Sequence, residues 1–188
     1  MLNNIYKIIK FIIAIILTFN INLSVQASRI TDSYDGNIFP IYAGNGSIVP
    51  PQTNLKESLK NHRTSILFFY LDDSADSKAL APIISGLDLI WRTRIDIIAL
   101  TTDELQNQIN SSKEEAGFYW NGYIPQTVIL DGNGEIKLDQ NGLIDIDKIN
   151  NVISEIEGID LKDSSFSLES FNEYNSRISK KNNPTNRE

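Results

Sequence analysis

The fold is decided by residues 64–78, which read TSILFFYLDDSADSK. The apolar and aromatic run 65–70 is typical of a buried strand. A short acidic turn follows at 71–73, and residues 74–78 then open a helical stretch that contains Pro82. The sequence therefore predicts a strand, a turn and a helix with an internal proline.

The rest of the chain continues this alternation. Asn54 is the expected N-cap of a brief helix over 55–59, which precedes the first core strand. Beyond that strand the sequence predicts, in order, a helix to about Arg92, a strand at 95–100, a short helix from Asp103, a strand after Pro125, a Gly132-Asn133-Gly134 turn, a strand at 135–138, and a helix after Asp145 with one apolar face (Ile146, Ile149, Val152, Ile153 and Ile156). The core order is β-α-β-α-β-β-α.

This arrangement resembles the thioredoxin-like superfamily. Ser74 and Ser77 stand where that family has its two cysteines, with Ala75 and Asp76 between them. Lys78 stands where a lysine follows the second cysteine. The resemblance implies an α/β fold of the thioredoxin type, with a central mixed sheet flanked by helices.

Three further positions match or depart from the family pattern. Pro82 matches the helix proline, and Pro125 after Ile124 matches the cis-proline that packs against the motif and exposes a backbone edge to partner peptides. Phe68 stands where many thioredoxins have a buried aspartate that exchanges protons with the redox pair. The resemblance implies that both the sulfur chemistry and its proton relay are missing.

The chain contains no cysteine. Because thiol–disulfide exchange needs a thiolate, a dithiol oxidoreductase is excluded. A serine hydrolase would need a base beside Ser74 or Ser77, yet the one histidine, His62, precedes the first core strand. Serines at a helix start usually cap free backbone amides. We therefore expect no catalytic residue, no metal, no cofactor and no enzymatic activity.

Residues 1–27 have the pattern of an export signal. Two lysines precede the apolar run 11–17, and small residues before Ser28 offer a cleavage site. Two asparagines interrupt the apolar stretch, which is shorter than the roughly 20 residues that a membrane span prefers. The pattern leaves open a cleaved signal peptide and an uncleaved signal anchor that associates the protein with a membrane.

Charge limits the partners of the mature protein. The full chain has a formal net charge of −7, and removing residues 1–27 removes two lysines and no acid, which gives −9. Binding to nucleic acid needs clustered Lys and Arg, so we expect no nucleic-acid partner.

The expected organisation is one domain with two extensions. Residues 28–63 read as an extended and irregular segment with a short helix, and the apolar residues within 38–42 are expected to pack on the domain. The thioredoxin-like domain covers 64–157. Residues 158–188 are expected to form a short amphipathic helix, over 168–178, and a disordered tail.

Two side-chain clusters each have two readings. The acidic cluster of Asp72, Asp73 and Asp76 offers oxygen ligands to a hard cation, but aspartates also serve turns and helix starts. The aromatic residues Phe118, Tyr119, Trp120 and Tyr123 before Pro125 suit either a rim for a protein partner or the core.

A closer resemblance rests on longer stretches, namely 41–51 (IYAGNGSIVPP), 69–74 (FYLDDS), 124–128 (IPQTV) and 171–175 (FNEYN). They resemble a cyanobacterial family of thioredoxin-like thylakoid proteins described as thylakoid membrane photosystem I accessory factors. This resemblance implies an exported protein in the thylakoid lumen or membrane, with the periplasm as the alternative.

The resulting hypothesis is a non-catalytic accessory or assembly factor that binds photosystem I subunits or assembly intermediates. Its expected partner-binding face consists of Ser74, Ala75, Asp76, Ser77, Ile124, Pro125 and Trp120. Two alternatives remain: a metal-dependent or other non-thiol enzyme that uses Asp72, Asp73 and Asp76, and a structural lumenal domain without a peptide groove.

Overall fold

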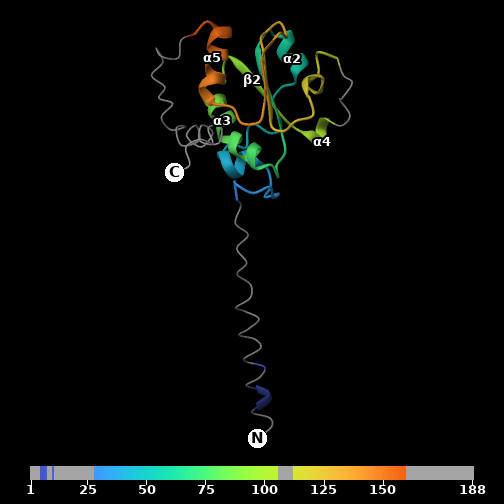
Figure 1. Cartoon of the computed structure of the whole chain (residues 1–188), viewed down its shortest axis with the longest axis vertical. Coiled ribbons are helices and arrows are strands. Elements are labelled where there is room, and N and C mark those ends of the chain that lie inside the picture. The colour runs from blue at the N-terminus through green and yellow to red at the C-terminus, as the bar shows by residue number, and fades with distance from the viewer. Residues whose placement is uncertain (1–4, 8–9, 11–27, 106–111, 160–188) are drawn as a thin grey trace, which may run out of the picture.

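A computed structural model of the chain describes residues 5–7, 10, 28–105 and 112–159 (Figure 1). The expected export signal lies outside the described residues except for 5–7 and 10. The expected C-terminal helix and tail lie outside them as well. In the described part of the chain, no helix has both the length and the hydropathy needed to cross a bilayer.

Four strands form one mixed sheet, in the order β2-β1-β3-β4. Their bounds are Thr64–Tyr70 for β1, Ile95–Thr101 for β2, Gln126–Leu130 for β3 and Ile136–Asn141 for β4. β2 pairs parallel to β1, β3 pairs antiparallel to β1, and β4 pairs antiparallel to β3. This topology confirms the predicted α/β fold with a central mixed sheet flanked by helices.

Helices cover both faces of the sheet, as Figure 1 shows. The helices α3 (Ala75–Trp91) and α5 (Ile146–Glu157) pack on one face, and the short elements α2 (Leu55–Lys60), α4 (Thr102–Leu105) and η2 (Ala116–Tyr119) pack on the other. Along β1, Phe68 belongs to the first cluster and Phe69 to the second, because successive side chains of a strand point to opposite faces. Burial on both faces explains why β1 is apolar without interruption.

Side-chain caps fix the starts of three helices where the sequence predicted them. Asn54 accepts a hydrogen bond from the amide of Glu57, Ser74 from that of Ser77, and Asp145 from that of Asp147. Such caps satisfy amides that have no partner inside the helix, so local sequence is sufficient to set these boundaries.

The turn between β3 and β4 is organised by Asp131. Its Oδ1 accepts hydrogen bonds of 2.9 Å from the amides of Asn133 and Glu135, which confirms the hairpin reading of this segment. Gly132 is required by a close approach, because a Cβ there would lie 2.4 Å from the carbonyl oxygen of His62. His62 itself is exposed, as expected for a loop histidine.

The N-terminal extension is less irregular than predicted. Residues Phe39–Ala43 form a helical turn, η1, that ends at Gly44 in the left-handed region (φ 63°). Phe39 is fully buried, and its ring centroid lies 5.5 Å from that of Tyr70. The prediction of an extended, irregular segment from residue 28 to the helix at 55–59 is therefore wrong at this turn, because burial of Phe39 against the sheet and a glycine able to end the turn outweigh the loop-like composition.

Candidate functional site

The two serines at the expected cysteine positions both accept hydrogen bonds from backbone amides, and Ser74 caps α3. Ser74 Oγ accepts a hydrogen bond of 3.2 Å from the Ser77 amide, and Ser77 Oγ accepts one of 3.3 Å from the Leu71 amide. Ser77 is fully buried. The capping reading is confirmed for Ser74, and the buried Ser77 ties the start of α3 to the end of β1.

Residues 28–44, here called the strap, lie against the start of α3. Asp32 Oδ1 accepts a hydrogen bond of 2.8 Å from the amide of Ala75, the first residue of the helix. Asp72 Oδ1 accepts one of 2.9 Å from the amide of Ile38. The strap therefore satisfies backbone amides of the motif region, and the motif region satisfies one of the strap.

Lys78, in the first turn of α3, binds the strap through its ammonium group. Its side chain is fully buried, and its Nζ donates to the carbonyl oxygens of Ser28 (3.3 Å), Thr31 (3.0 Å) and Ser33. Nζ also lies 2.7 Å from Asp35 Oδ2. A buried ammonium needs compensating partners of this kind, because it loses its hydration when it leaves water.

Tyr42 completes this cage. Its hydroxyl donates a hydrogen bond of 2.6 Å to Asp35 Oδ2, and its ring centroid lies 5.5 Å from Lys78 Nζ. Hydrogen bonds from Lys78 and then from Tyr42 hold the pKa of Asp35 below its ordinary value. Burial, together with the hydrogen bond to Asp35, raises the pKa of Tyr42 to about 12.

One of the three aspartates of the acidic cluster beside the motif binds the strap. Asp72 accepts the hydrogen bond of the Ile38 amide, and burial raises the pKa of the Asp72 carboxyl group. Asp73 is exposed and Asp76 is half-buried in the first turn of α3. Within residues 28–105 and 112–159, no group of three or more His, Cys, Asp or Glu side chains is arranged to hold a metal ion.

The loop before β3 is held by Gln126, which is fully buried. Its Nε2 donates to the Tyr119 carbonyl oxygen (2.9 Å) and to Asp139 Oδ1 (2.8 Å), and its Oε1 accepts from the Asn121 amide (3.0 Å). The Ile124–Pro125 peptide bond is cis, as the resemblance implied, and Pro125 is buried. Sequence reasoning missed the role of Gln126, since a polar residue at the start of a strand gives no local signal of it.

The four aromatic residues of this loop divide between the core and the surface. Tyr119 is buried in the cluster beneath α2, and Trp120 is half-buried against the same cluster. The indole Nε1 of Trp120 is buried and has no hydrogen-bond partner among the described residues. Phe118 and Tyr123 are 47% and 66% exposed. Core packing therefore accounts for Tyr119 and Trp120, and a role in binding a protein partner stays a prediction for Phe118 and Tyr123.

The sheet brings the motif and the cis-proline loop to one end of the domain. Phe69 pairs with Gln126, so the residues that follow β1 and those that precede β3 leave the sheet at the same end. We call this the motif end. It contains Ser74 to Ser77, Ile124 and Pro125, and the strap lies across its helical side. His62 precedes β1 and so lies at the opposite end of that strand from Ser74, which removes it as a base for either serine.

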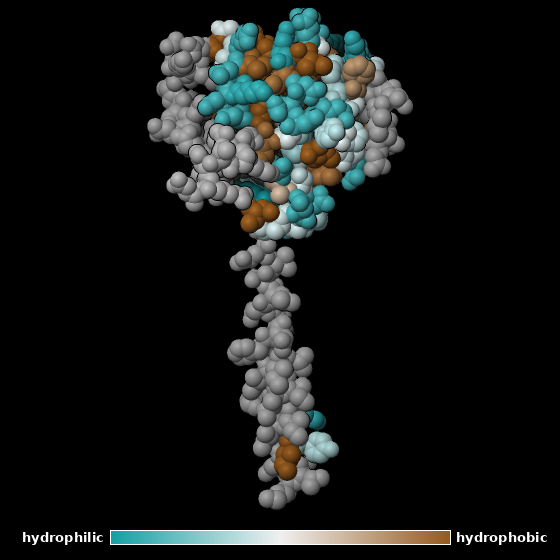
Figure 2. All heavy atoms as spheres, viewed as in Figure 1, coloured by the Kyte–Doolittle hydropathy of each residue, from teal (hydrophilic) through white to brown (hydrophobic). Residues whose placement is uncertain are grey.

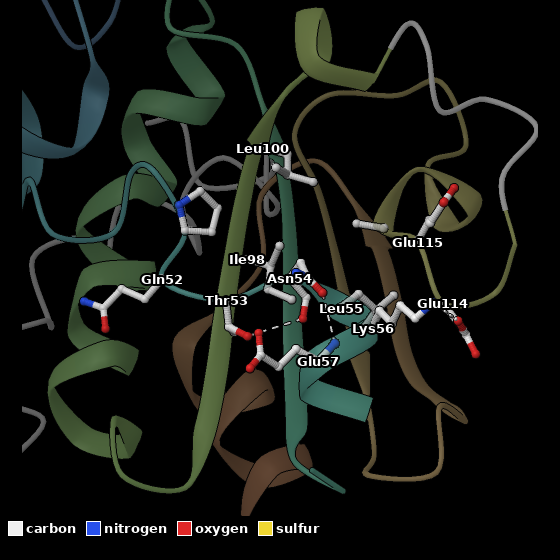
Figure 3. Close-up of a pocket in the computed structure, with 12 residues that line it drawn as sticks. Gln52, Thr53, Asn54, Leu55, Lys56, Glu57, Ile98, Leu100, Glu114 and Glu115 are labelled. Carbon is white, nitrogen blue, oxygen red and sulfur yellow. Dashed lines mark hydrogen bonds and ion pairs between the residues drawn. The ribbon is translucent and has the colours of Figure 1, made fainter. Parts of the chain in front are cut away.

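A separate cleft of about 750 Å³ lies on the face of the sheet covered by α2 (Figure 3). Leu55, Ile98 and Leu100 line it, and the exposed ion pair between Lys56 and Glu114 (3.2 Å) bridges its rim. None of the residues of the expected partner-binding face lines it. No local pattern in the sequence predicted this cleft, because its walls come from three distant segments.

Comparison with known proteins gives a close relative in sequence. The chain is 40% identical over 151 residues to the thylakoid membrane protein slr1796 of Synechocystis sp., and the match covers 78% of this chain and 74% of that protein. No protein-family model matches the sequence.

Solved structures give weaker matches. A mutant thioredoxin from Halobacterium salinarum NRC-1 matches with a TM-score of 0.44 and 20% identity, over 54% of this chain and 81% of that one. A structure described as that of a malarial protein matches with a TM-score of 0.42 and 11% identity, over 50% of this chain and 97% of that one.

Proposed function

Because this chain belongs to the family of the Synechocystis thylakoid membrane protein slr1796, we propose that it is a thylakoid protein that binds other proteins and catalyses no reaction. In its more specific form, the proposal is an accessory or assembly factor for photosystem I. The partner is a photosystem I subunit or an assembly intermediate, and it docks at the motif end.

The observation that carries this proposal is the loop before β3. The buried Gln126 fixes it with two hydrogen bonds, one donated to the Tyr119 carbonyl oxygen and one accepted from the Asn121 amide, and the loop presents the exposed rings of Phe118 and Tyr123. Rigid, exposed aromatic side chains are favoured at protein interfaces, since they bury large apolar areas at a small cost in conformational entropy. A fixed loop of this kind suits recognition.

The residues at the former redox site also favour binding over catalysis. The hydroxyl groups of Ser74 and Ser77 accept backbone amide hydrogens, and the ammonium group of Lys78 is enclosed by the strap. A nucleophile needs an accessible side chain with a base beside it, and neither serine has a base among its hydrogen-bond partners. These polar groups stabilise the scaffold.

The geometry suits an extended segment of the partner. The resemblance to thioredoxins implies that the backbone beside Ile124 and Pro125 pairs with a peptide of the partner by strand addition. Trp120, the aromatic residue of the expected face, is half-buried against the cluster beneath α2, and the half-buried Ser74, Ala75 and Asp76 lie at the same end as Pro125. Ser77 is fully buried and supports this face through the hydrogen bond that its hydroxyl accepts from the Leu71 amide.

The competing proposal, a metal-dependent enzyme, has less support. Asp72 is engaged by the Ile38 amide, which leaves fewer carboxylate oxygens for a cation. Calorimetric titration with calcium, magnesium and manganese tests it directly. Saturable binding that is lost in an Asp72→Ala, Asp73→Ala double variant would favour the enzyme over the binding factor.

Native separation of gently solubilised thylakoids from cells with a C-terminally tagged copy tests the main proposal. We expect the tag to migrate with photosystem I, and a Phe118→Ala, Tyr123→Ala double variant to lose this co-migration. Leu89→Ala with Ile136→Ala is the matched control, because those side chains are exposed and apolar but lie outside the loop. A wild-type tag that migrates only at monomer size would contradict the proposal.

A further inference from the structure

Exposed apolar side chains are unevenly distributed over the domain. Seven large hydrophobic residues are exposed within residues 28–105 and 112–159, namely Ile30, Tyr34, Ile41, Leu89, Phe118, Tyr123 and Ile136. Phe118 and Tyr123 belong to the cis-proline loop. Three of the remaining five lie on the strap, which occupies the same end of the domain. Figure 2 shows apolar surface at this end.

The strap is fixed to the domain and does not act as a loose linker. Lys78 binds the carbonyl oxygens of Ser28 and Thr31, and Asp32 caps the first amide of α3. The side chains on its outer surface therefore have a fixed direction relative to the domain. Ile30 is 82% exposed and Tyr34 is 74% exposed, so neither contributes to the core.

The strap follows the N-terminal apolar run in the sequence. That run ends at Leu17, and Ser28 lies eleven positions further along the chain. A fully extended chain of that length spans at most about 40 Å. If the apolar run lies in a membrane, the strap is therefore tethered within that distance of the bilayer.

From these observations we propose that the strap is a membrane-contact surface, on which Ile30, Tyr34 and Ile41 insert into the interfacial region of the lipid bilayer. The proposal rests on the membrane location in the proposed function. Tyrosine is enriched at such interfaces because its ring is apolar and its hydroxyl remains hydrated. With the strap on the bilayer, the motif end, which contains Pro125, lies near the membrane surface, where a membrane-embedded partner is within reach.

The charge of this end selects the kind of lipid. Asp32 on the strap and Asp73 beside it are exposed, whereas Arg29 of the strap is half-buried with its guanidinium 5.7 Å from the Tyr42 ring centroid. Carboxylates are repelled by the negative surface potential of anionic lipids. The surface therefore fits a bilayer of uncharged headgroups, and added anionic lipid should weaken the contact.

The absence of cysteine makes the test clean, because each single-cysteine variant carries one spin label. The full chain is reconstituted into phosphatidylcholine vesicles with labels at Ile30→Cys or Tyr34→Cys, and at Leu89→Cys or Ile136→Cys as matched controls. Collision of the label with oxygen, which concentrates in lipid, is compared with collision with a water-soluble nickel complex. We expect the strap labels to favour oxygen and the control labels to favour nickel, and the strap preference to fall when phosphatidylglycerol is added.

A fifth label, at Ala14→Cys in the apolar run, separates this inference from the proposed membrane location. If the Ala14 label is in lipid and the strap labels are as aqueous as the controls, the proposed contact of the strap with the bilayer is overturned, while attachment to the membrane through the apolar run stands. If the Ala14 and strap labels are all aqueous, both are overturned. Strap labels in lipid support the inference whether or not the Ala14 label is in lipid.

Discussion

Lys78 Nζ lies 2.7 Å from Asp35 Oδ2, and this pair joins the start of α3 to a strap that precedes it by 43 residues in the chain. The lysine side chain is fully buried and the aspartate side chain is 8% exposed. The residues at the start of α3 thus serve as an attachment point for the N-terminal segment. This attachment and the loop beside it can be tested by substitution and by pH.

Replacement of Lys78 by methionine should release the strap. It leaves Asp35 and three carbonyl oxygens without their cation, and removal of one partner of a buried ion pair typically costs about 3–5 kcal/mol. We expect a lower free energy of unfolding and faster hydrogen exchange of the amides in the strap, while exchange in β1 is less affected. Lys148→Met is the control, since that lysine is exposed on α5. Equal exchange of the strap in both variants would show that Lys78 does not hold it.

The stability of the strap should decrease at both acidic and alkaline pH. Because Lys78 and Tyr42 lower the pKa of Asp35 from 3.8, the stabilisation by this carboxylate is complete above pH 3.8 and decreases as pH falls further. Because burial raises the pKa of Tyr42 from 10.0 to about 12, its contribution is complete below pH 10 and is lost as pH rises through about 12. Denaturant unfolding across both ranges measures these effects. The acid-side loss should be smaller in Asp35→Asn and the alkaline-side loss smaller in Tyr42→Phe.

Gln126→Ala should loosen the loop that presents Tyr123. The change leaves the buried carbonyl group of Tyr119 without its partner, and an unsatisfied buried group costs about 1–3 kcal/mol. It also removes the acceptor of the amide of Asn121, an exposed residue. We expect reduced stability and weaker association with the membrane partner, although Gln126 is itself buried. Gln52→Ala is the control, because Gln52 is exposed. If a folded Gln126→Ala variant associated normally with its partner, the geometry of this loop would not be required for binding.

Introducing cysteines at both serine positions should not create an efficient oxidoreductase. In a Ser74→Cys, Ser77→Cys variant the second thiol replaces a fully buried side chain, and Phe68 supplies no proton relay. A reactive thiol must be accessible and ionised, so we expect slow labelling by a thiol reagent at position 77 and faster labelling at position 74. Addition of Lys78→Met should accelerate labelling at position 77 if the strap limits access. Fast reaction of both thiols in the double variant would contradict this account.

Much of the fold could be predicted because its signals are local. The continuous apolar run of β1, the caps Asn54, Ser74 and Asp145, and the Asp131 turn each depend on residues within a few positions of one another. The site was predicted less completely. Six of the seven residues of the expected face, all but Trp120, lie at one end of the sheet, and their role in binding stays a prediction. Ser77 proved to be a buried support, and the helical turn at Phe39–Ala43 was missed.

The sequence by itself determined the order of strands and helices, the cap at Ser74 and the exclusion of thiol chemistry, because these depend on periodicity, neighbouring residues or the simple absence of an element. Only the tertiary structure decided that Lys78 is buried under the strap and that Gln126 holds the loop before β3. The physical reason is that burial of a charged or polar side chain is favourable only when distant backbone groups replace its hydration. The carbonyl oxygens that do this for Lys78 come from residues 28–33, and no local pattern around Lys78 specifies their approach.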